Sequence, residues 1–129
     1  MPSVRRLWFG LLGRTLNRVT LRLARAGRGP FTIVRHRGRV SGRTYETPVI
    51  VARLGGDAVV ELTYGDRVQW YRNVVAAGGC ALVRGSEVLT VVAVEPLDVE
   101  EGLAAFGGFR AVVLRALRRR EFRRFVVGR

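Results

Sequence analysis

The chain has 129 residues, 48% of them hydrophobic and 26% charged, which is the balance of one ordinary globular domain and excludes a disordered chain. Its formal net charge is +13, and all 23 basic residues are arginine, so a mechanism that needs a lysine nucleophile or Schiff base is excluded. No apolar run approaches the roughly 18 residues of a membrane span, and no signal-peptide pattern is evident.

The positive charge is concentrated at the two ends of the chain. Residues 1–43 hold eleven arginines and no acid, whereas residues 110–129 hold eight arginines and one acid. This distribution favours an acidic ligand, an anionic membrane surface or nucleic acid as a partner. The single cysteine, Cys80, excludes an intramolecular disulfide and favours a cytoplasmic location, and we expect it to be an unreactive core residue.

An amphipathic helix is predicted near the N-terminus. Apolar residues recur every three or four positions over 4–26, opposite a row of arginines. The glycines and the proline of 27–30 end this helix, so an N-terminal helical segment is expected over 1–28.

Short apolar runs separated by glycine-containing turns predict β-strands. Gly55 and Gly56 form the turn of one expected hairpin, and Gly85 forms the turn of another. About five antiparallel strands would leave exposed edges unless they closed on themselves, so we expect an α+β fold built on a small barrel. The strands are expected at 31–35, 47–54, 58–63, 80–84 and 87–95, which makes 31–95 the barrel core.

Helices are predicted within and after the barrel core. One is expected over 67–77, between the two hairpins, and a pair of glycines follows it. Asp98 is placed to cap a short helix. A longer basic helix is predicted over 109–127, which makes 98–127 a pair of C-terminal helices. Because no repeat or linker divides the chain, 1–129 is expected to be a single domain.

The stretch 37–43, between the first two strands, has the composition of an anion-binding turn. It contains three arginines, two glycines and a serine within seven residues. Glycine lets the backbone approach a ligand, exposed N–H groups bind phosphate oxygens, and guanidinium groups grip them in bidentate fashion. The sequence therefore makes this turn a candidate phosphate site, with an ordinary solvated loop as the alternative.

No constellation of acid–base or nucleophilic residues is found. The lone His36 and the lone Cys80 cannot form a zinc site, and Ser41 lacks the glycine-flanked turn of a serine nucleophile. The stretch 38–42 also lacks the lysine of a phosphate-binding loop and leads into a strand rather than a helix. Chemistry carried by a bound cofactor is therefore favoured, and no catalytic or metal-binding residue of the chain is assigned.

The segment 64–79 is a second candidate site. Gly65 leads towards the N-terminus of the predicted helix, where partial positive charge and free N–H groups favour an anionic or electron-rich ligand. Trp70, Arg72 and Asn73 follow within two turns. The alternative is that Trp70 belongs to the core and Arg72 faces solvent.

Taken together, the two segments resemble the deazaflavin (F420)-dependent nitroreductase and quinone reductase family, small oxidoreductases of actinobacteria and their relatives. The resemblance runs over about 32–95. It implies a split β-barrel related to flavin-reductase and FMN-binding folds. It also implies that reduced F420 donates a hydride to a quinone or nitroaromatic acceptor. The motifs that carry it are Gly38-Arg39-Val40-Ser41-Gly42-Arg43, then Thr47-Pro48, then a hairpin, then Tyr64-Gly65 and Trp70-Tyr71-Arg72-Asn73.

The resemblance implies where F420 would bind. Its phosphate and acidic tail are expected at the arginine-rich turn, and its ring is expected against the second strand, the loop after the hairpin and the helix behind it. The candidate contacts are Arg37, Arg39, Ser41, Gly42 and Arg43 in the turn, Pro48, Val49 and Ile50 in the strand, Tyr64 and Gly65 in the loop, and Trp70 and Asn73 in the helix.

The chain departs from the family pattern at two positions in or beside the turn. Val40 stands where many members carry lysine, and Tyr45 stands where they carry a further basic residue. These differences remove expected phosphate contacts, for which Arg37 and Arg43 are placed to compensate. Because F420 is a polyanion, a chain with a net charge of +13 is suited to attract it.

Alternatives stay open at this stage. FMN, FAD or haem could replace F420, because related split barrels use other cofactors. A membrane-peripheral protein that binds anionic lipid is the main rival, and nucleic acid is disfavoured because no row of exposed aromatic residues is evident. The protein is expected in the cytoplasm, with attachment to the inner face of the membrane and a homodimer left open. The membrane hypothesis rests on 4–26 and on a tail helix that carries Leu114, Leu117, Phe122 and Phe125 among arginines.

Overall fold

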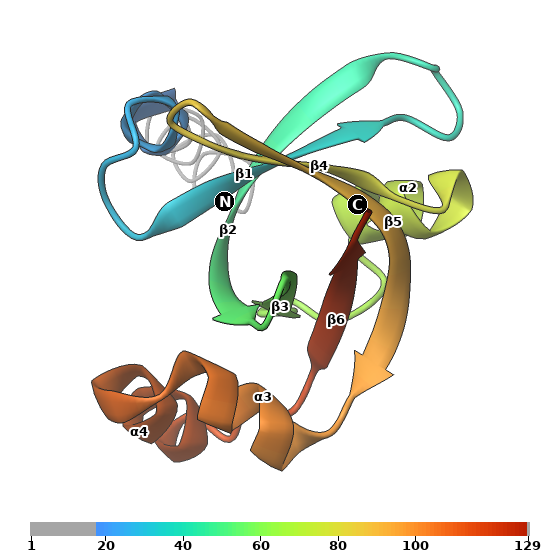
Figure 1. Ribbon diagram of the computed structural model, residues 1–129. Helices are drawn as coiled ribbons and strands as arrows, with labels where there is room; N and C mark the ends of the chain where they lie inside the picture. Colours follow the sequence, from blue (N-terminus) through green and yellow to red (C-terminus); the bar gives the residue numbers. More distant parts are fainter. Residues whose placement is uncertain (1–17, 129) are drawn as a thin grey trace, which may run out of the picture.

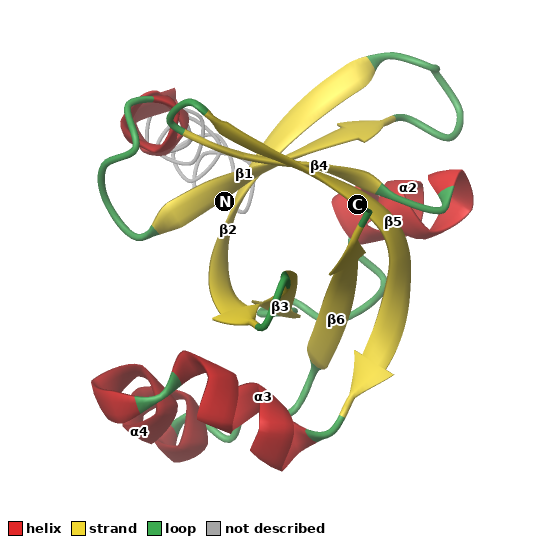
Figure 2. Cartoon of the chain, in the orientation of Figure 1, coloured by secondary structure: helices red, strands yellow, loops and turns green. Residues whose placement is uncertain are grey.

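The computed structural model describes residues 18–128, which form a closed six-stranded antiparallel β-barrel surrounded by helices (Figure 1). The strand order around the barrel is β1-β2-β3-β6-β5-β4. In Figure 2, the helices α3 and α4 lie together at one end of the barrel. The strands are β1 (Phe31–Arg37), β2 (Thr44–Leu54), β3 (Asp57–Glu61), β4 (Cys80–Arg84), β5 (Glu87–Leu97) and β6 (Phe122–Val127). The helices are α2 (Gln69–Ala77), α3 (Val99–Phe106) and α4 (Gly108–Ala116), preceded by helical residues 18–25.

The small antiparallel barrel expected from the sequence is confirmed, with one strand more than expected. All five predicted strands are present, and β2 begins three residues earlier than predicted. In β1, Val34 and His36 are buried while Arg35 and Arg37 are exposed, which is the alternation of a strand with one face on the core. The predicted inserted helix is α2, which contacts β1.

The predicted basic helix over 109–127 is wrong in its last part, because residues 122–127 form strand β6. This strand pairs with β3 on one side and with β5 on the other and so closes the barrel. Phe122 and Phe125 are both fully buried. Three residues apart in a strand, they point to opposite faces: Phe125 into the barrel core and Phe122 under α3. Because a spacing of three residues also fits one face of a helix, the sequence pattern predicted a helix where the chain forms a strand.

The two helices predicted after β5 begin as expected. Asp98 caps α3, and its carboxylate accepts a hydrogen bond from the N–H of Glu100 at 3.1 Å. Gly102 lies directly over Phe122, where a Cβ would overlap the ring. Beyond the end of α4, Arg118 adopts a φ of 55°, in the left-handed region that favours glycine. This left-handed residue turns the chain away from the helical path and towards β6.

The N-terminal helix is described only from residue 18, so its prediction over 4–17 lies outside the described residues. Ala24 is fully buried and packs with Ile33 and Val83. Arg84 donates hydrogen bonds to the carbonyls of Gly27, Gly29 and Phe31, and these bonds hold the connection to β1.

In the described part of the chain, no helix is both long enough and apolar enough to span a bilayer.

The burial of Phe125 provides a test of β6. Phe125→Ala is expected to lower the free energy of unfolding by about 3–5 kcal/mol, because it removes a ring that is fully buried in the barrel. Phe109→Ala, on the exposed side of α4, is the control and is expected to change stability by less than about 0.5 kcal/mol. Urea unfolding followed by circular dichroism measures both. Equally small losses of stability in the two variants would contradict the burial of Phe125 in strand β6.

Candidate functional site

A cavity of about 530 Å³ lies between the β1–β2 turn and the first residues of α2. Its size is within the range of pockets that bind small molecules and cofactors. The predicted arginine-rich turn forms one wall, and the helix of the second candidate segment forms the other. The cavity is therefore built by the two segments that the sequence singled out. Its lining residues are His36, Gly38, Arg39, Val40, Ser41, Tyr45, Glu46, Thr47, Gln69, Trp70 and Asn73.

The β1–β2 turn is held in shape by its glycines and by internal hydrogen bonds. The N–H of Gly38 donates to the carbonyl of Arg43 at 2.7 Å, and the N–H of Gly42 donates to the carbonyl of Gly38 at 2.9 Å. A Cβ on Gly38 would come 2.6 Å from the Ser41 hydroxyl and 2.8 Å from the Tyr45 ring, so a side chain there would force these two residues to move. Gly42 has a φ of +72°, which a side chain disfavours. The N–H groups of Gly38 and Gly42, which belong to the turn expected to bind a phosphate, are thus already hydrogen-bonded within it.

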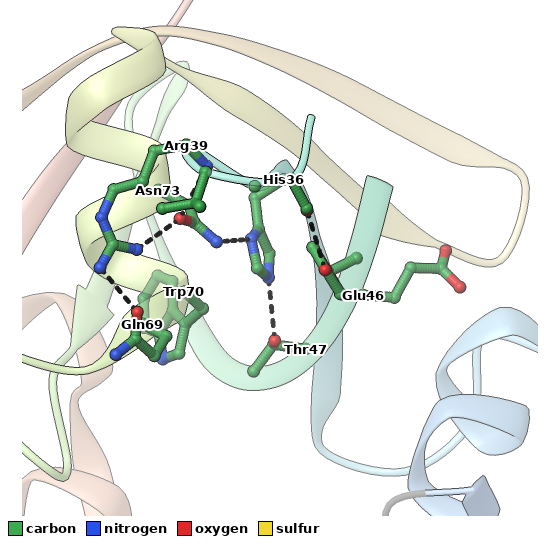
Figure 3. Close-up of a pocket in the computed structure, with 11 residues that line it drawn as sticks. His36, Arg39, Glu46, Thr47, Gln69, Trp70 and Asn73 are labelled. Atoms are coloured by element: carbon green, nitrogen blue, oxygen red, sulfur yellow. Dashed lines mark hydrogen bonds between the residues drawn. The ribbon is translucent and has the colours of Figure 1, made fainter. Parts of the chain in front are cut away.

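A chain of hydrogen bonds joins the turn, α2, β1 and β2 (Figure 3). The backbone N–H and the guanidinium Nη1 of Arg39 both donate to Asn73 Oδ1, at 3.2 and 2.7 Å. Arg39 Nη2 donates to Gln69 Oε1 at 2.7 Å. Asn73 Nδ2 lies 3.1 Å from His36 Nδ1, and His36 Nε2 lies 3.1 Å from Thr47 Oγ1. The turn and the helix are therefore fixed relative to each other through polar side chains.

The direction of each hydrogen bond in this series follows from the charged guanidinium of Arg39 at one end of it. Because Asn73 Oδ1 accepts from Arg39, the amide nitrogen of Asn73 must face His36 and donate to Nδ1. The proton of a neutral His36 then sits on Nε2 and is donated to the Thr47 hydroxyl oxygen. Thr47 keeps its own hydroxyl proton, and it lines the cavity. The result is a hydroxyl donor available to a ligand.

Burial keeps His36 neutral. Desolvation lowers the pKa of its imidazole below the usual value, because the cationic form is poorly solvated inside the barrel. A proton on Nδ1 would also face the N–H group of Asn73 instead of a lone pair. The ring stacks against Tyr45, with 5.9 Å between the ring centroids. His36 thus acts in this site as a fixed neutral hydrogen-bonding group.

A second cavity of about 360 Å³ adjoins the first, and Thr47 and Trp70 line both. Its walls are mainly apolar, but Glu61 also lines it, and Glu61 Oε1 is buried without a hydrogen-bond partner among the described residues. Such an atom suits a ligand that brings an N–H donor. The lining residues are Phe31, Thr47, Pro48, Val49, Ile50, Glu61, Leu62, Thr63, Tyr64, Gly65, Val68 and Trp70.

Nine of the twelve predicted contact residues line these two cavities. Arg37, Gly42 and Arg43 line neither; Arg37 Nε instead donates to the Gly42 carbonyl at 3.1 Å. Trp70 stands where the cavities meet, and its ring lies 6.4 Å from that of Phe125. The residues in the first cavity are Arg39, Ser41, Trp70 and Asn73, and those in the second are Pro48, Val49, Ile50, Tyr64, Gly65 and Trp70.

Sequence reasoning did not assign His36, Thr47, Gln69 or Glu61 to the site. A signal for His36 was present, because it alternates with exposed arginines in β1 and so had to face inward. Gln69 carries no such signal, since its role depends on the distance between α2 and the turn. Glu61 ends β3, and only the barrel brings it beside the second cavity.

Two other titratable groups are accounted for by their surroundings. Partial burial raises the pKa of the Glu46 carboxyl, but hydrogen bonds and charges from Arg25 and Arg35 outweigh it, so the pKa is lowered. Figure 3 shows the Glu46 carboxylate turned away from His36. Burial raises the pKa of the Cys80 thiol to about 12, so it is protonated at neutral pH, as expected of an unreactive residue.

The fold defines a class of protein, a small split β-barrel, and this one has two adjoining cavities. A solved structure described as a heme binding protein from Mycobacterium smegmatis has the same fold, with a TM-score of 0.54 and 16% sequence identity. The match covers 81% of this chain but only 48% of that one, so this chain spans about half its length. Among curated protein sequences, none matches the chain.

The chain belongs to the F420H(2)-dependent quinone reductase family, whose sequence profile matches residues 13–106. This membership confirms the resemblance carried by the two motif segments, both of which lie inside the matched range. The family is one of oxidoreductases, and its description names reduced F420 and a quinone. The FMN alternative finds no support in the family description.

The neutral state of His36 predicts a pH dependence of stability. Below about pH 6.5, the unfolded chain takes up a proton that folded His36 resists, so stability falls as the pH drops from there towards the lower folded pKa. His36→Gln removes this contribution, and its loss of stability between pH 7.5 and 5.5 is expected to be smaller than that of the wild type. Urea unfolding at the two pH values measures the difference. Identical pH dependence would show that His36 titrates normally.

Proposed function

We propose that the protein binds F420 across the two cavities and transfers a hydride from its reduced form to a quinone. The observation that carries the proposal is the match between the two cavities and the two ends of this cofactor. F420 joins a flat deazaflavin ring to a phosphodiester and a polyglutamate tail. A polar cavity with an arginine wall adjoins a mainly apolar one, and the chain belongs to the family described by this activity.

The anionic part of the cofactor fits the first cavity. Among residues 18–128, Arg39 bonds only to the neutral side-chain oxygens of Gln69 and Asn73, so no carboxylate of this part of the chain neutralises its charge. Each of its terminal nitrogens uses one N–H in these bonds, which leaves further donors for a phosphate. The N-cap of α2, Val68, offers no side-chain cap, so the first N–H groups of the helix add positive potential at this wall.

The ring fits the second cavity. Pro48, Val49 and Ile50 supply an apolar wall from β2, and Trp70 closes the junction with the first cavity. Glu61 Oε1, buried without a partner among residues 18–128, suits a ring N–H. When bound, reduced F420 supplies the hydride. The chain itself positions the ring, excludes water from one side and holds the Thr47 hydroxyl as a donor at the junction.

The acceptor would approach through the open side of the second cavity. Tyr64 lines this cavity and is 87% exposed, so it is available to contact an aromatic acceptor. A quinone agrees with the family description, and a nitroaromatic compound is a further candidate because it is also planar and electron-poor. The side chains that line the second cavity do not include a proton donor that would serve a quinone but not a nitroaromatic compound, or the reverse.

Haem is supported less well by the same residues. His36 is the only histidine of the chain, and both its ring nitrogens are engaged, one with Asn73 and one with Thr47. The thiol of Cys80 has a pKa of about 12, which makes it a poor thiolate ligand. Axial ligation by His36 or Cys80 would require these contacts or protonation states to change.

F420 titration tests the anion contacts. Saturable binding at micromolar concentration or below is expected, and Arg39→Ala combined with Arg43→Ala is expected to weaken it about tenfold or more, because charge-assisted hydrogen bonds are lost. Arg53→Ala combined with Arg110→Ala is the charge-matched control, since neither residue lies in the β1–β2 turn or lines a cavity. The quenching of F420 fluorescence measures affinity. Equal weakening by both pairs would indicate attraction by net charge alone.

Reoxidation of reduced F420 by a soluble quinone, followed by visible absorbance, completes this test. Turnover that depends on the protein is expected with the wild type and with the Arg53→Ala, Arg110→Ala control. Binding of F420 without any turnover with quinone or nitroaromatic compounds would support a carrier instead of a reductase. No binding of F420 at micromolar concentrations would defeat the proposal.

Thr47→Val tests the hydroxyl at the junction of the cavities. The change keeps the shape of the side chain but removes the donor and leaves the N–H of His36 Nε2 without an acceptor. The affinity for F420 is expected to fall about fivefold or more, whereas Thr47→Ser retains the hydroxyl and is expected to stay close to the wild type. The same fluorescence titration measures both. If Thr47→Val and the wild type bind F420 with equal affinity, the Thr47 hydroxyl does not take part in binding.

A further inference from the structure

The solvent-facing side of α4 is apolar. Its apolar residues follow the i, i+3, i+4, i+7, i+8 spacing that places side chains on one helix face. Phe109 is 82% exposed, Val112 63% and Leu117 58%, and no residue of α4 is buried. Leu114 lies on the other side and packs against the core around Phe122. The exposed face consists of Phe109, Val112, Val113, Ala116 and Leu117, and we call it the α4 face.

Arginines occur along α4 and in the segment directly after it, and most of them lack an acidic partner. Arg115 pairs with Glu100 at 2.9 Å. Arg110, Arg118 and Arg120 are exposed and form no ion pair within residues 18–128. The segment 108–120 contains five arginines and no acid. A cavity of about 330 Å³ opens between α3 and the end of α4, lined by Val99, Glu100, Leu103, Arg115, Arg118, Arg119 and Arg120.

We propose that the α4 face docks on an anionic lipid bilayer. An amphipathic helix inserts apolar side chains at the headgroup boundary while neighbouring arginines bind lipid phosphates, and α4 together with the segment after it supplies both. A second copy of the chain fits less well, because pairing two α4 faces would bring two sets of unpaired arginines together. Nucleic acid would use the arginines but leave an exposed phenylalanine and three exposed aliphatic side chains without a role.

This surface differs from the one that the sequence suggested. The predicted tail helix relied on Phe122 and Phe125, which are buried in the barrel, and on Leu114, which faces the core. The structure leaves Leu117 exposed and adds residues of α4 that precede it. The docking surface is therefore a short helix held against the barrel, while the tail continues into β6.

The segment after α4 is hydrogen-bonded to residues that line the second cavity. Arg119 Nη1 donates to the Thr63 carbonyl at 3.0 Å, and the Leu62 N–H donates to the Glu121 carbonyl at 2.7 Å. Thr63 and Leu62 both line that cavity. The docking proposal does not depend on F420 binding, because it concerns the free protein.

Vesicle sedimentation of the full chain without cofactor tests the proposal. Binding is expected to vesicles of phosphatidylcholine mixed with phosphatidylglycerol, to weaken in high salt, and to be much weaker on phosphatidylcholine alone. Phe109→Ser combined with Leu117→Ser is expected to weaken binding about tenfold or more by removing apolar contacts. Val88→Ser combined with Val92→Ser, two exposed apolar residues of β5, is the matched control and should bind like the wild type.

Arg118→Gly provides a variant that does not threaten the fold. It removes one arginine of the surface and relieves a left-handed backbone position, so the free energy of unfolding is expected to stay equal or rise. Binding to the anionic vesicles is expected to fall about fivefold, the contribution of one arginine near such a surface. Arg53→Gln is its charge-matched control.

The outcomes separate the proposal from its rivals. The proposal is overturned if the Phe109→Ser, Leu117→Ser variant and Arg118→Gly both bind the anionic vesicles as strongly as the wild type does. This holds even if another segment binds lipid. Equal binding to neutral and anionic vesicles would overturn the role of the arginines. A dimer in solution that is lost in the Phe109→Ser, Leu117→Ser variant, together with no vesicle binding, would assign the α4 face to a second copy. If these variants bind F420 like the wild type, the docking proposal and the F420 proposal can be accepted or rejected independently of each other.

Discussion

The closure of the barrel by β6 is the constraint on which the rest of the structure depends. Without this strand, β3 and β5 would present unpaired backbone edges, and the Phe125 ring would leave the interior. The same strand carries Phe122 on its outer face, where α3 covers it. One strand therefore joins the core inside the barrel to the helical layer at its end.

Closure also positions the two cavities of the candidate site. Arg123 of β6 donates to the Tyr71 hydroxyl of α2 at 3.1 Å, and its guanidinium lies 5.7 Å from the centre of that ring. The residue before β6, Glu121, accepts from Leu62 in the loop that leads to α2. The helix that forms one wall of the first cavity is thus anchored from the far end of the chain. The bond between Asn73 and Arg39 then sets its distance from the β1–β2 turn.

The arginines of this chain fall into groups defined by their partners. Arg84 binds three backbone carbonyls, and Arg25 pairs with Glu46, so both stabilise the connection of the N-terminal helix to the barrel. Arg39 bonds to the neutral side-chain oxygens of Asn73 and Gln69, and neither of them neutralises its charge. Arg118 is exposed at the end of α4 with no acidic partner in the described part of the chain. Net charge alone does not distinguish these roles.

The sequence by itself determined much of the barrel and the location of the site. Alternation of apolar residues and glycine turns is a local property, and it predicted five of the strands, α2 and the cap at Asp98. The order of the two motif segments identified the family and nine residues that line the cavities. These signals lie within short stretches, so they are readable without knowing what packs against them.

Only the tertiary structure decided what Phe122 and Phe125 do, which residue orients the Thr47 hydroxyl and where Glu61 lies. Two phenylalanines three positions apart fit a helix stripe or the two faces of a strand, and the choice depends on the unpaired edges of β3 and β5. The role of His36 depends on Asn73, which lies 37 positions away in the sequence. Contacts of this kind are set by closure of the barrel, and no local pattern in the sequence encodes them.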